Sequence, residues 1–117
     1  MNLEGLTLPE QVAFAVLLKA LITADGAVSR EEGMTLSEAA RVLGADVFQR
    51  AEAVHLPDEA ALASFLGTVE RQEARDRIYD ALLEAARADG IQAPESRLLD
   101  LVAERWDIVV VGGHAPG

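Results

Sequence analysis

Apolar residues recur every three or four positions along most of the chain, the spacing that places them on one face of an α-helix. Residues 12–24 depart from this pattern, because only Lys19 and Thr23 are polar among them. A helix that is apolar almost all round is typical of the buried centre of a bundle. Five narrower stripes follow: Leu36, Ala39, Ala40 and Leu43; Val47, Phe48, Ala51 and Val54; Leu62, Phe65, Leu66 and Val69; Ile78, Leu82, Ala85 and Ala86; and Leu98, Leu99, Val102 and Trp106. The pattern predicts an all-α helical bundle of about six helices.

Capping and breaking residues predict where these helices begin and end. Thr7 followed by Glu10 is a capping box before the first helix, and Ser29 followed by Glu32 is a second one. Leu-Pro-Asp at residues 56–58 is predicted to end the third helix. Glycines can adopt the left-handed conformation that ends a helix. The glycines expected at helix ends are Gly26, Gly44 and Gly90.

Residues 71–88 are predicted to form a long amphipathic helix, and the pattern leaves open a break just before it, near residues 67–70. The arginines at its start, Arg71, Arg75 and Arg77, alternate with acidic residues. Mixed charges along a helix face are typical of a solvated surface. We therefore expect these arginines to face solvent.

The end of the chain differs in character from the rest. Residues 108–111 are strand-like, and a Gly/Pro-rich stretch follows them. We expect the strand-like segment to pack on its own domain, with pairing to another chain through an exposed edge as the alternative. The predicted organisation is one helical domain over residues 1–108 and a flexible tail over residues 109–117.

Two stretches of the chain share a loop sequence. ALITADGAVSREE spans residues 20–32 and EAARADGIQAPES spans residues 84–96. A shift of 64 aligns Leu18 with Leu82 before the loop, and a shift of 63 aligns Glu32 with Glu95 after it. Each unit is a helix, an Asp-Gly turn and a second helix. A lone hairpin of this kind cannot bury its apolar face, so we expect the two units to face one another with pseudo-two-fold symmetry.

This repeated pattern resembles the tellurite-resistance TerB-like family over residues 9–108. The similarity consists of an apolar helix that runs into Ala-Asp-Gly, a short polar link, a Glu and a second amphipathic helix, all present twice. The second turn departs from the pattern, because Asp89 and Glu95 are six positions apart whereas Asp25 and Glu32 are seven apart. The resemblance implies an all-helical fold, a role in tellurite or chemical-stress systems and a divalent-cation site of acidic residues. It implies no established enzyme activity.

Charge and composition narrow the classes of partner. The chain has 20 acidic and 10 basic residues and a formal net charge of −10, which disfavours nucleic acid and anionic membrane surfaces and favours cations or a basic protein surface. The absence of cysteine excludes disulfides and thiolate chemistry. The apolar run at residues 12–18 is too short to span a bilayer, and the first residues lack a basic signal-peptide region. A cytoplasmic protein is expected.

The acidic residues of the repeated loops are the candidate metal ligands. Asp25, Glu32, Asp89 and Glu95 could present four carboxylates to calcium or magnesium, with backbone carbonyls and water completing the shell. The alternative is structural: the aspartates can hold turn N–H groups and the glutamates can cap helices. Both interpretations stay open at the level of sequence.

No pattern of residues indicates catalysis. His55 lies beside a Pro break, and no Ser or Asp partner is implied for it or for His114. We expect a non-enzymatic, acidic interaction module that docks a partner protein, with no catalytic or cofactor-binding residues. The alternative function is that of a divalent-cation-binding domain.

Overall fold

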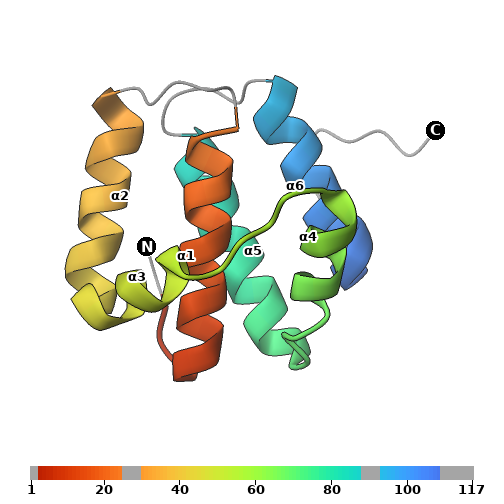
Figure 1. Ribbon diagram of the computed structural model, residues 1–117, viewed down its shortest axis with the longest axis horizontal. Helices are drawn as coiled ribbons and strands as arrows, with labels where there is room; N and C mark the ends of the chain where they lie inside the picture. The colour runs from red at the N-terminus through yellow and green to blue at the C-terminus, as the bar shows by residue number, and fades with distance from the viewer. Residues whose placement is uncertain (1–2, 25–29, 88–92, 109–117) are drawn as a thin grey trace.

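The computed structural model describes residues 3–24, 30–87 and 93–108. Their helices are α1 (Leu8–Ile22), α2 (Arg30–Leu43), α3 (Ala45–Glu52), α4 (Glu59–Leu66), α5 (Gln72–Arg87) and α6 (Ala93–Trp106) (Figure 1). None of the described residues is in a strand. The prediction of an all-α bundle is therefore confirmed, with six helices in the part of the chain that is described. Within these ranges every helix falls short of the length and apolarity needed to cross a bilayer.

α1 is the central helix, as its nearly all-apolar sequence predicts. It contacts α2, α3, α5 and α6, and Phe14, Leu17 and Leu18 on it are completely buried. Burial of each large apolar side chain contributes about 1.5–3 kcal/mol relative to exposure. Side chains on several faces of α1 are buried because neighbouring helices surround it.

The hydrophobic core has two parts that meet at α1. The larger part joins α1 to α5 and α6 and includes Ile78, Leu82 and Trp106. The smaller part joins α1 to α3 and consists of Ala15, Val16, Val47 and Ala51. The small alanines of this second part allow the short helix α3 to approach α1 closely.

The connection between α4 and α5 is held by side chains of later helices. α4 ends at Leu66 and α5 begins at Gln72, so the break near residues 67–70 that the sequence leaves open is present. Arg75 donates from Nε to the carbonyl of Val69 at 2.6 Å, and the completely buried Trp106 donates from Nε1 to the carbonyl of Leu66 at 2.8 Å. The first bond holds the carbonyl of Val69 within the connection, and the second adds a donor to the carbonyl of the last residue of α4. Arg75 is half-buried and holds this connection, so the expectation that it faces solvent is met only in part.

The last described residues close α6 and continue into the core. Asp107 has a φ of 54°, its N–H donates to the carbonyl of Glu104 at 3.3 Å, and the N–H of Ile108 donates to the carbonyl of Ala103 at 2.8 Å. These two bonds form a Schellman motif. Ile108 is a loop residue that packs against the core, so the strand-like expectation is wrong at this residue. Residues 109–111 and the predicted tail at 109–117 lie outside the described residues.

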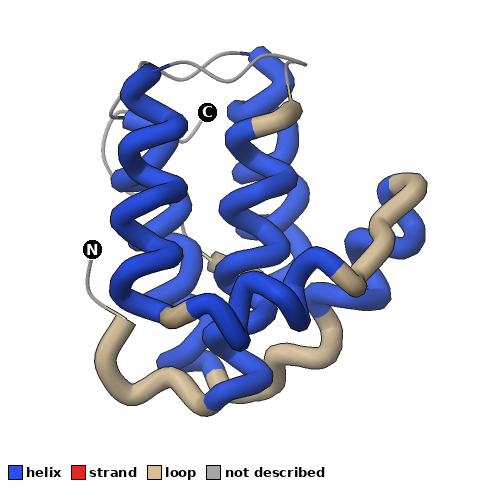
Figure 2. The backbone as a smooth tube through the Cα atoms, turned by 60° about the vertical axis from the view of Figure 1, so that its left-hand side comes forward, coloured by secondary structure: helices blue, strands red, loops and turns tan. Residues whose placement is uncertain are grey.

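Four helix ends lie at one end of the molecule. These are the C-terminal ends of α1 and α5 and the N-terminal ends of α2 and α6 (Figures 1 and 2). The predicted helix-ending glycine Gly44 follows α2 and has a φ of 92°, as expected. Gly26, Gly90 and the predicted cap Ser29 lie outside the described residues.

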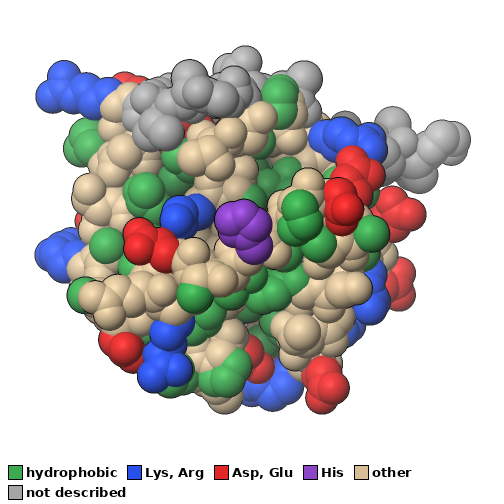
Figure 3. Space-filling view, viewed as in Figure 1, with side chains coloured by type: hydrophobic (Ala, Val, Ile, Leu, Met, Phe, Trp, Pro, Cys, Tyr) green, Lys and Arg blue, Asp and Glu red, His purple; other side chains and the backbone are tan. Residues whose placement is uncertain are grey.

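The segment between α3 and α4 crosses the face of α1. We call residues 53–58 the crossover segment; it runs in front of α1 in Figure 1, on the side away from α5. Leu56 in this segment packs against both parts of the core. On the same side of the molecule, apolar side chains gather in the middle of the surface and charged ones lie mostly towards its edges (Figure 3).

Candidate functional site

Two of the four predicted metal ligands are described by the structure, and both are buried. Glu32 is the third residue of α2 and is 5% exposed, and Glu95 is the third residue of α6 and is 2% exposed. Each has an interaction partner. Asp25 and Asp89 lie outside the described residues. The structure therefore locates half of the predicted set, at the end of the molecule where α2 and α6 begin (Figure 1).

A third buried glutamate shows what this position in a helix can do. Glu10 is the third residue of α1 and is 7% exposed. Its Oε1 accepts from the N–H of Thr7 at 2.8 Å, and its own N–H donates to Oγ1 of Thr7 at 3.4 Å. This reciprocal pair is the capping box predicted from the sequence. Capping is thus an observed role for a buried glutamate at the third helical position in this chain.

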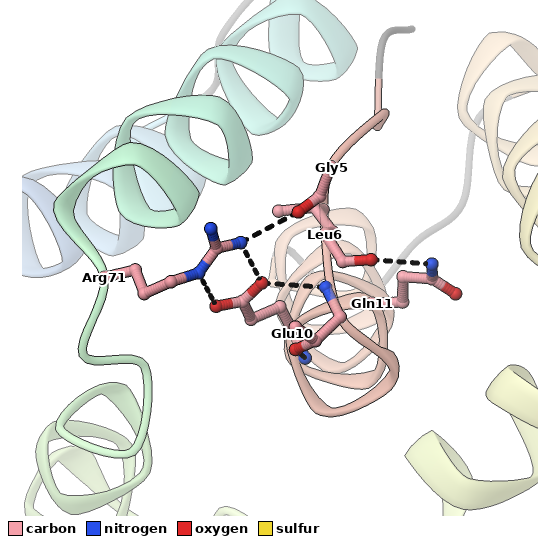
Figure 4. A network of polar contacts seen from close by, with 6 residues as sticks. Gly5, Leu6, Glu10, Gln11 and Arg71 are labelled. Atoms are coloured by element: carbon pink, nitrogen blue, oxygen red, sulfur yellow. Dashed lines mark hydrogen bonds and ion pairs between the residues drawn. The ribbon is translucent and has the colours of Figure 1, made fainter.

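Glu10 also forms an ion pair that the sequence did not reveal. Arg71 donates from Nε to Oε2 of Glu10 at 2.8 Å and from Nη2 to Oε1 at 2.6 Å, and the same Nη2 donates to the carbonyl of Gly5 at 2.8 Å (Figure 4). Hydrogen bonding to Arg71 lowers the pKa of Glu10 from 4.5 to about 2, against the opposing effect of burial. Arg71 is exposed, as predicted, but the sequence does not predict its pairing with Glu10. No local signal in the sequence points from Arg71 to a residue 61 positions earlier.

The end of the molecule that contains Glu32 and Glu95 combines features of opposite polarity. Helix N-termini favour anions, which suits glutamates in the first turns of α2 and α6, whereas helix C-termini present carbonyl oxygens that favour cations. Calcium requires about six to eight oxygen ligands. The described residues contain no group of three or more His, Asp or Glu side chains that could hold a metal ion. The four-residue site therefore stays a prediction that depends on Asp25 and Asp89.

A separate feature, absent from the sequence predictions, is a shallow groove beside the crossover segment. Its larger hollow, of about 410 Å³, is lined by Ala20, Ala24, Leu56, Asp58, Glu59, Leu62, Pro94, Arg97, Leu98 and Leu101. Its smaller hollow, of about 310 Å³, is lined by Val16, Lys19, Ala20, Thr23, Ala24, Ala51, Val54 and Leu56. We call the two hollows together the α1 groove, because both use Ala20 and Ala24 of the α1 region as their floor and share Leu56.

Most charged groups of the α1 groove have partners within the chain. Asp58 caps α4 by accepting from the N–H of Ala61 at 2.8 Å. Glu59 accepts from Nη2 and Nε of Arg97 at 2.6 and 3.0 Å. The Lys19 ammonium forms no hydrogen bond or ion pair with any described residue. The larger hollow is therefore mainly apolar and the smaller one is mixed, with Lys19 in its lining as a cation that has no partner among the described residues.

The α1 groove contains no set of groups arranged for catalysis among its described lining residues. Its lining has one lysine and no histidine, and His55, although it lies on the crossover segment, is exposed and absent from the lining. A general base needs a partner that orients it. The sequence signal for the groove was weak, since residues 56–58 were interpreted only as a helix break.

Comparison of the chain with protein-family models, with curated proteins and with solved structures finds no match in any of the three.

Proposed function

We propose that this chain is a non-enzymatic interaction module that docks a partner protein on the α1 groove. The observation that supports this function best is the groove itself, a surface open to solvent that is mainly apolar in its larger hollow and is built from α1, α3, α4, α6 and the crossover segment. Binding sites are typically concave and mainly apolar, with a few polar groups that orient the ligand. Leu98 and Leu101 of α6, both partly exposed, supply the apolar contact area, and the buried Leu62 of α4 also lines the larger hollow.

The net charge and the resemblance to the TerB-like pattern suggest the class of partner and the setting of this role. The net charge of −10 disfavours nucleic acid as the partner, which leaves a protein surface as the proposed one. The repeated helix, Asp-Gly turn and helix units, which we propose to be pseudo-symmetric, are similar to the TerB-like pattern. That similarity suggests a tellurite or chemical-stress response as the setting in which the module acts.

Filling the groove should remove partner binding. Ala20 lines both hollows and is only partly buried, so Ala20→Gln places a longer side chain in the groove without disturbing the fully buried core. Ser37→Gln, at an exposed position of α2 outside the α1 groove, is the matched control. Circular dichroism and thermal melting establish that both variants fold.

The comparison is made by affinity capture from a lysate of the source organism with quantitative mass spectrometry. We expect proteins that are retained by the wild type and by Ser37→Gln to be lost with Ala20→Gln. Equal retention by all three chains would refute the role of the groove. Turnover of a substrate by the purified chain would refute the non-enzymatic assignment.

The second candidate function is divalent-cation binding by Asp25, Glu32, Asp89 and Glu95. The observation that favours it is the matched placement of Glu32 and Glu95, each buried at the third position of a helix at the same end of the molecule. The two buried carboxylates and the two carboxylates of the loops would together attract a calcium or magnesium ion. The capping role seen for Glu10 is the competing explanation for both glutamates.

Metal titrations distinguish capping from cation binding. Calcium or magnesium added to isotopically labelled protein should shift amide resonances at the start of α2 and α6, and the double variant Asp25→Asn plus Asp89→Asn should abolish the response. Glu70→Gln, which removes an exposed carboxylate elsewhere, should leave it intact. Absence of any response at millimolar metal, or an unchanged response in the double variant, would eliminate this function.

A further inference from the structure

The two hollows of the α1 groove adjoin, because they share lining residues. Ala20 and Ala24 of the α1 region and Leu56 of the crossover segment line both. An apolar segment that contacts one hollow can therefore place a neighbouring side chain in the other. The combined surface suits a short peptide segment with two or more apolar residues better than a single compact ligand.

The charges that line the α1 groove are balanced, unlike those of the whole chain. Lys19 and Arg97 are positive and Asp58 and Glu59 are negative, so the lining has a net charge of zero in a chain of −10. Arg97 and Glu59 form an ion pair, and Asp58 accepts the N–H of Ala61. Lys19 is left as the charged group in the lining that has no partner among the described residues.

An acidic surface lies on α5, away from the α1 groove. A hollow on α5 is lined by Glu73, Asp76, Arg77, Asp80, Ala81 and Glu84. α5 lies behind α1 when the crossover segment faces the viewer (Figure 1). At physiological ionic strength the interaction of exposed charges is screened beyond about 8 Å. The local cation at the groove therefore outweighs the distant acidic stripe in selecting a bound group.

We propose, building on the docking role proposed above for the α1 groove, that the groove binds an apolar partner segment bearing a carboxylate, and that this carboxylate pairs with Lys19. Lys19 is partly buried beside Val16 and Val54, so an incoming carboxylate meets an ammonium that is partly shielded from water. The partner's apolar side chains occupy the two hollows. An arginine at position 19 preserves the pairing, whereas a glutamine removes it.

Three capped synthetic peptides test this specificity. They are acetylated and amidated, carry leucines at helical spacing, and differ only in one position that is Glu, Gln or Lys. Binding to the isotopically labelled full chain is mapped by amide shifts. The Glu peptide should shift resonances of the groove and bind up to about fivefold more tightly than the Gln peptide, the range of a partly exposed ion pair. The Lys peptide should bind most weakly.

Variants at position 19 test whether Lys19 causes the preference for the Glu peptide. Lys19→Gln should bind the Glu and Gln peptides equally, and Lys19→Arg should retain the preference for Glu. Lys19 is the only lysine in the chain, so a carbodiimide, which joins a carboxylate to an amine without a spacer, should couple the Glu peptide at Lys19. The Gln peptide should give no such product.

The outcomes separate this inference from the docking role itself. Equal binding of all three peptides in the groove, or tighter binding of the Lys peptide, would overturn the carboxylate preference and leave the groove as a docking face. Binding elsewhere, or no binding at millimolar peptide, would overturn both. If the amide resonances of the groove shift with protein concentration in the absence of peptide, the occupant is a second copy of the chain. If residues 109–117 contact the groove in the free chain, the occupant is the chain's own C-terminal segment. Either result would also overturn the inference.

Discussion

Arg71 binds both carboxylate oxygens of Glu10, although 61 residues separate the two in the chain. Glu10 lies in the first turn of α1, and Arg71 directly precedes α5. The same guanidinium reaches the carbonyl of Gly5 at 2.8 Å (Figure 4). One side chain thus joins the N-terminal segment, the start of α1 and the start of α5, so the contact is a tertiary cross-link at the end of the bundle opposite Glu32 and Glu95 (Figure 1).

The Glu10–Arg71 contact should make stability depend on acid pH. The pKa of Glu10 is about 2 in the folded chain and 4.5 ordinarily, so the unfolded chain takes up a proton first as the pH falls. The stabilisation is fully present above pH 4.5 and is lost as the pH decreases towards 2. At neutral pH we expect Glu10→Gln to lower the free energy of unfolding by about 1–2 kcal/mol, because the pair is partly exposed and screened.

Urea unfolding at a series of pH values, followed by the fluorescence of Trp106, measures this effect. The difference between the wild type and Glu10→Gln should shrink as the pH falls towards 2. Glu104→Gln, at an exposed position on α6, is the control and should show a small difference throughout. A Glu10→Gln difference that stays constant over the acid range would contradict the assignment.

Trp106 should stabilise the fold through its hydrogen bond as well as its size. Trp106→Phe keeps an aromatic ring but leaves the carbonyl of Leu66 without the indole N–H, which now donates at 2.8 Å in a fully buried position. We expect a loss of about 1–3 kcal/mol in the free energy of unfolding, from the lost hydrogen bond and the reduced ring volume, while the carbonyl of Leu66 still accepts from the N–H of Val69 at 3.2 Å. Circular dichroism in urea measures it, since the variant lacks the chain's only tryptophan. A loss under a few tenths of a kcal/mol would show that water replaces the indole without cost.

Alanine substitution at two glycines with similarly open surroundings should change the free energy of unfolding in opposite directions. A Cβ at Gly33 or at Gly44 would meet no atom within 4 Å, so neither substitution causes a clash. Gly33 is inside α2, where alanine should stabilise by about 0.5–1 kcal/mol. Gly44 has a φ of 92°, which strains any residue with a Cβ, so Gly44→Ala should destabilise by about 1–2 kcal/mol. Thermal melting of the two variants compares them directly, and shifts of the same sign would contradict this account.

Replacing Asp107 by glycine should stabilise the fold. It occupies the left-handed position of the Schellman motif that ends α6, with a φ of 54°, and it is exposed. Glycine adopts this conformation without a steric penalty, so Asp107→Gly should raise the free energy of unfolding by about 0.5–1 kcal/mol. Asp107→Val is the contrasting variant and should lower it, because a β-branched side chain is strained at positive φ. Stabilisation by valine, measured by urea unfolding, would contradict the motif.

The candidate sites differ in how far the sequence could predict them. The repeated loops pointed to Glu32 and Glu95, and the structure finds both buried at the end of the molecule where α2 and α6 begin. The α1 groove was not predicted, because its lining comes from α1, the crossover segment, α4 and α6. Lys19 appeared in the sequence only as an interruption of an apolar helix. Its position beside an apolar hollow follows from the path of residues 53–58.

The sequence by itself determined that the chain is helical and where some of the helices begin and end. The spacing of apolar residues, the capping box of Thr7 and Glu10 and the glycine after α2 are local features, whose energies depend on neighbours within about one or two turns. Tertiary structure alone decided that Arg71 pairs with Glu10 and that Trp106 donates to Leu66. Such pairs form only between helix faces that come together when the core excludes water. Hydrophobic burial drives this packing but is not directional, so the apolar pattern does not specify which polar groups will meet.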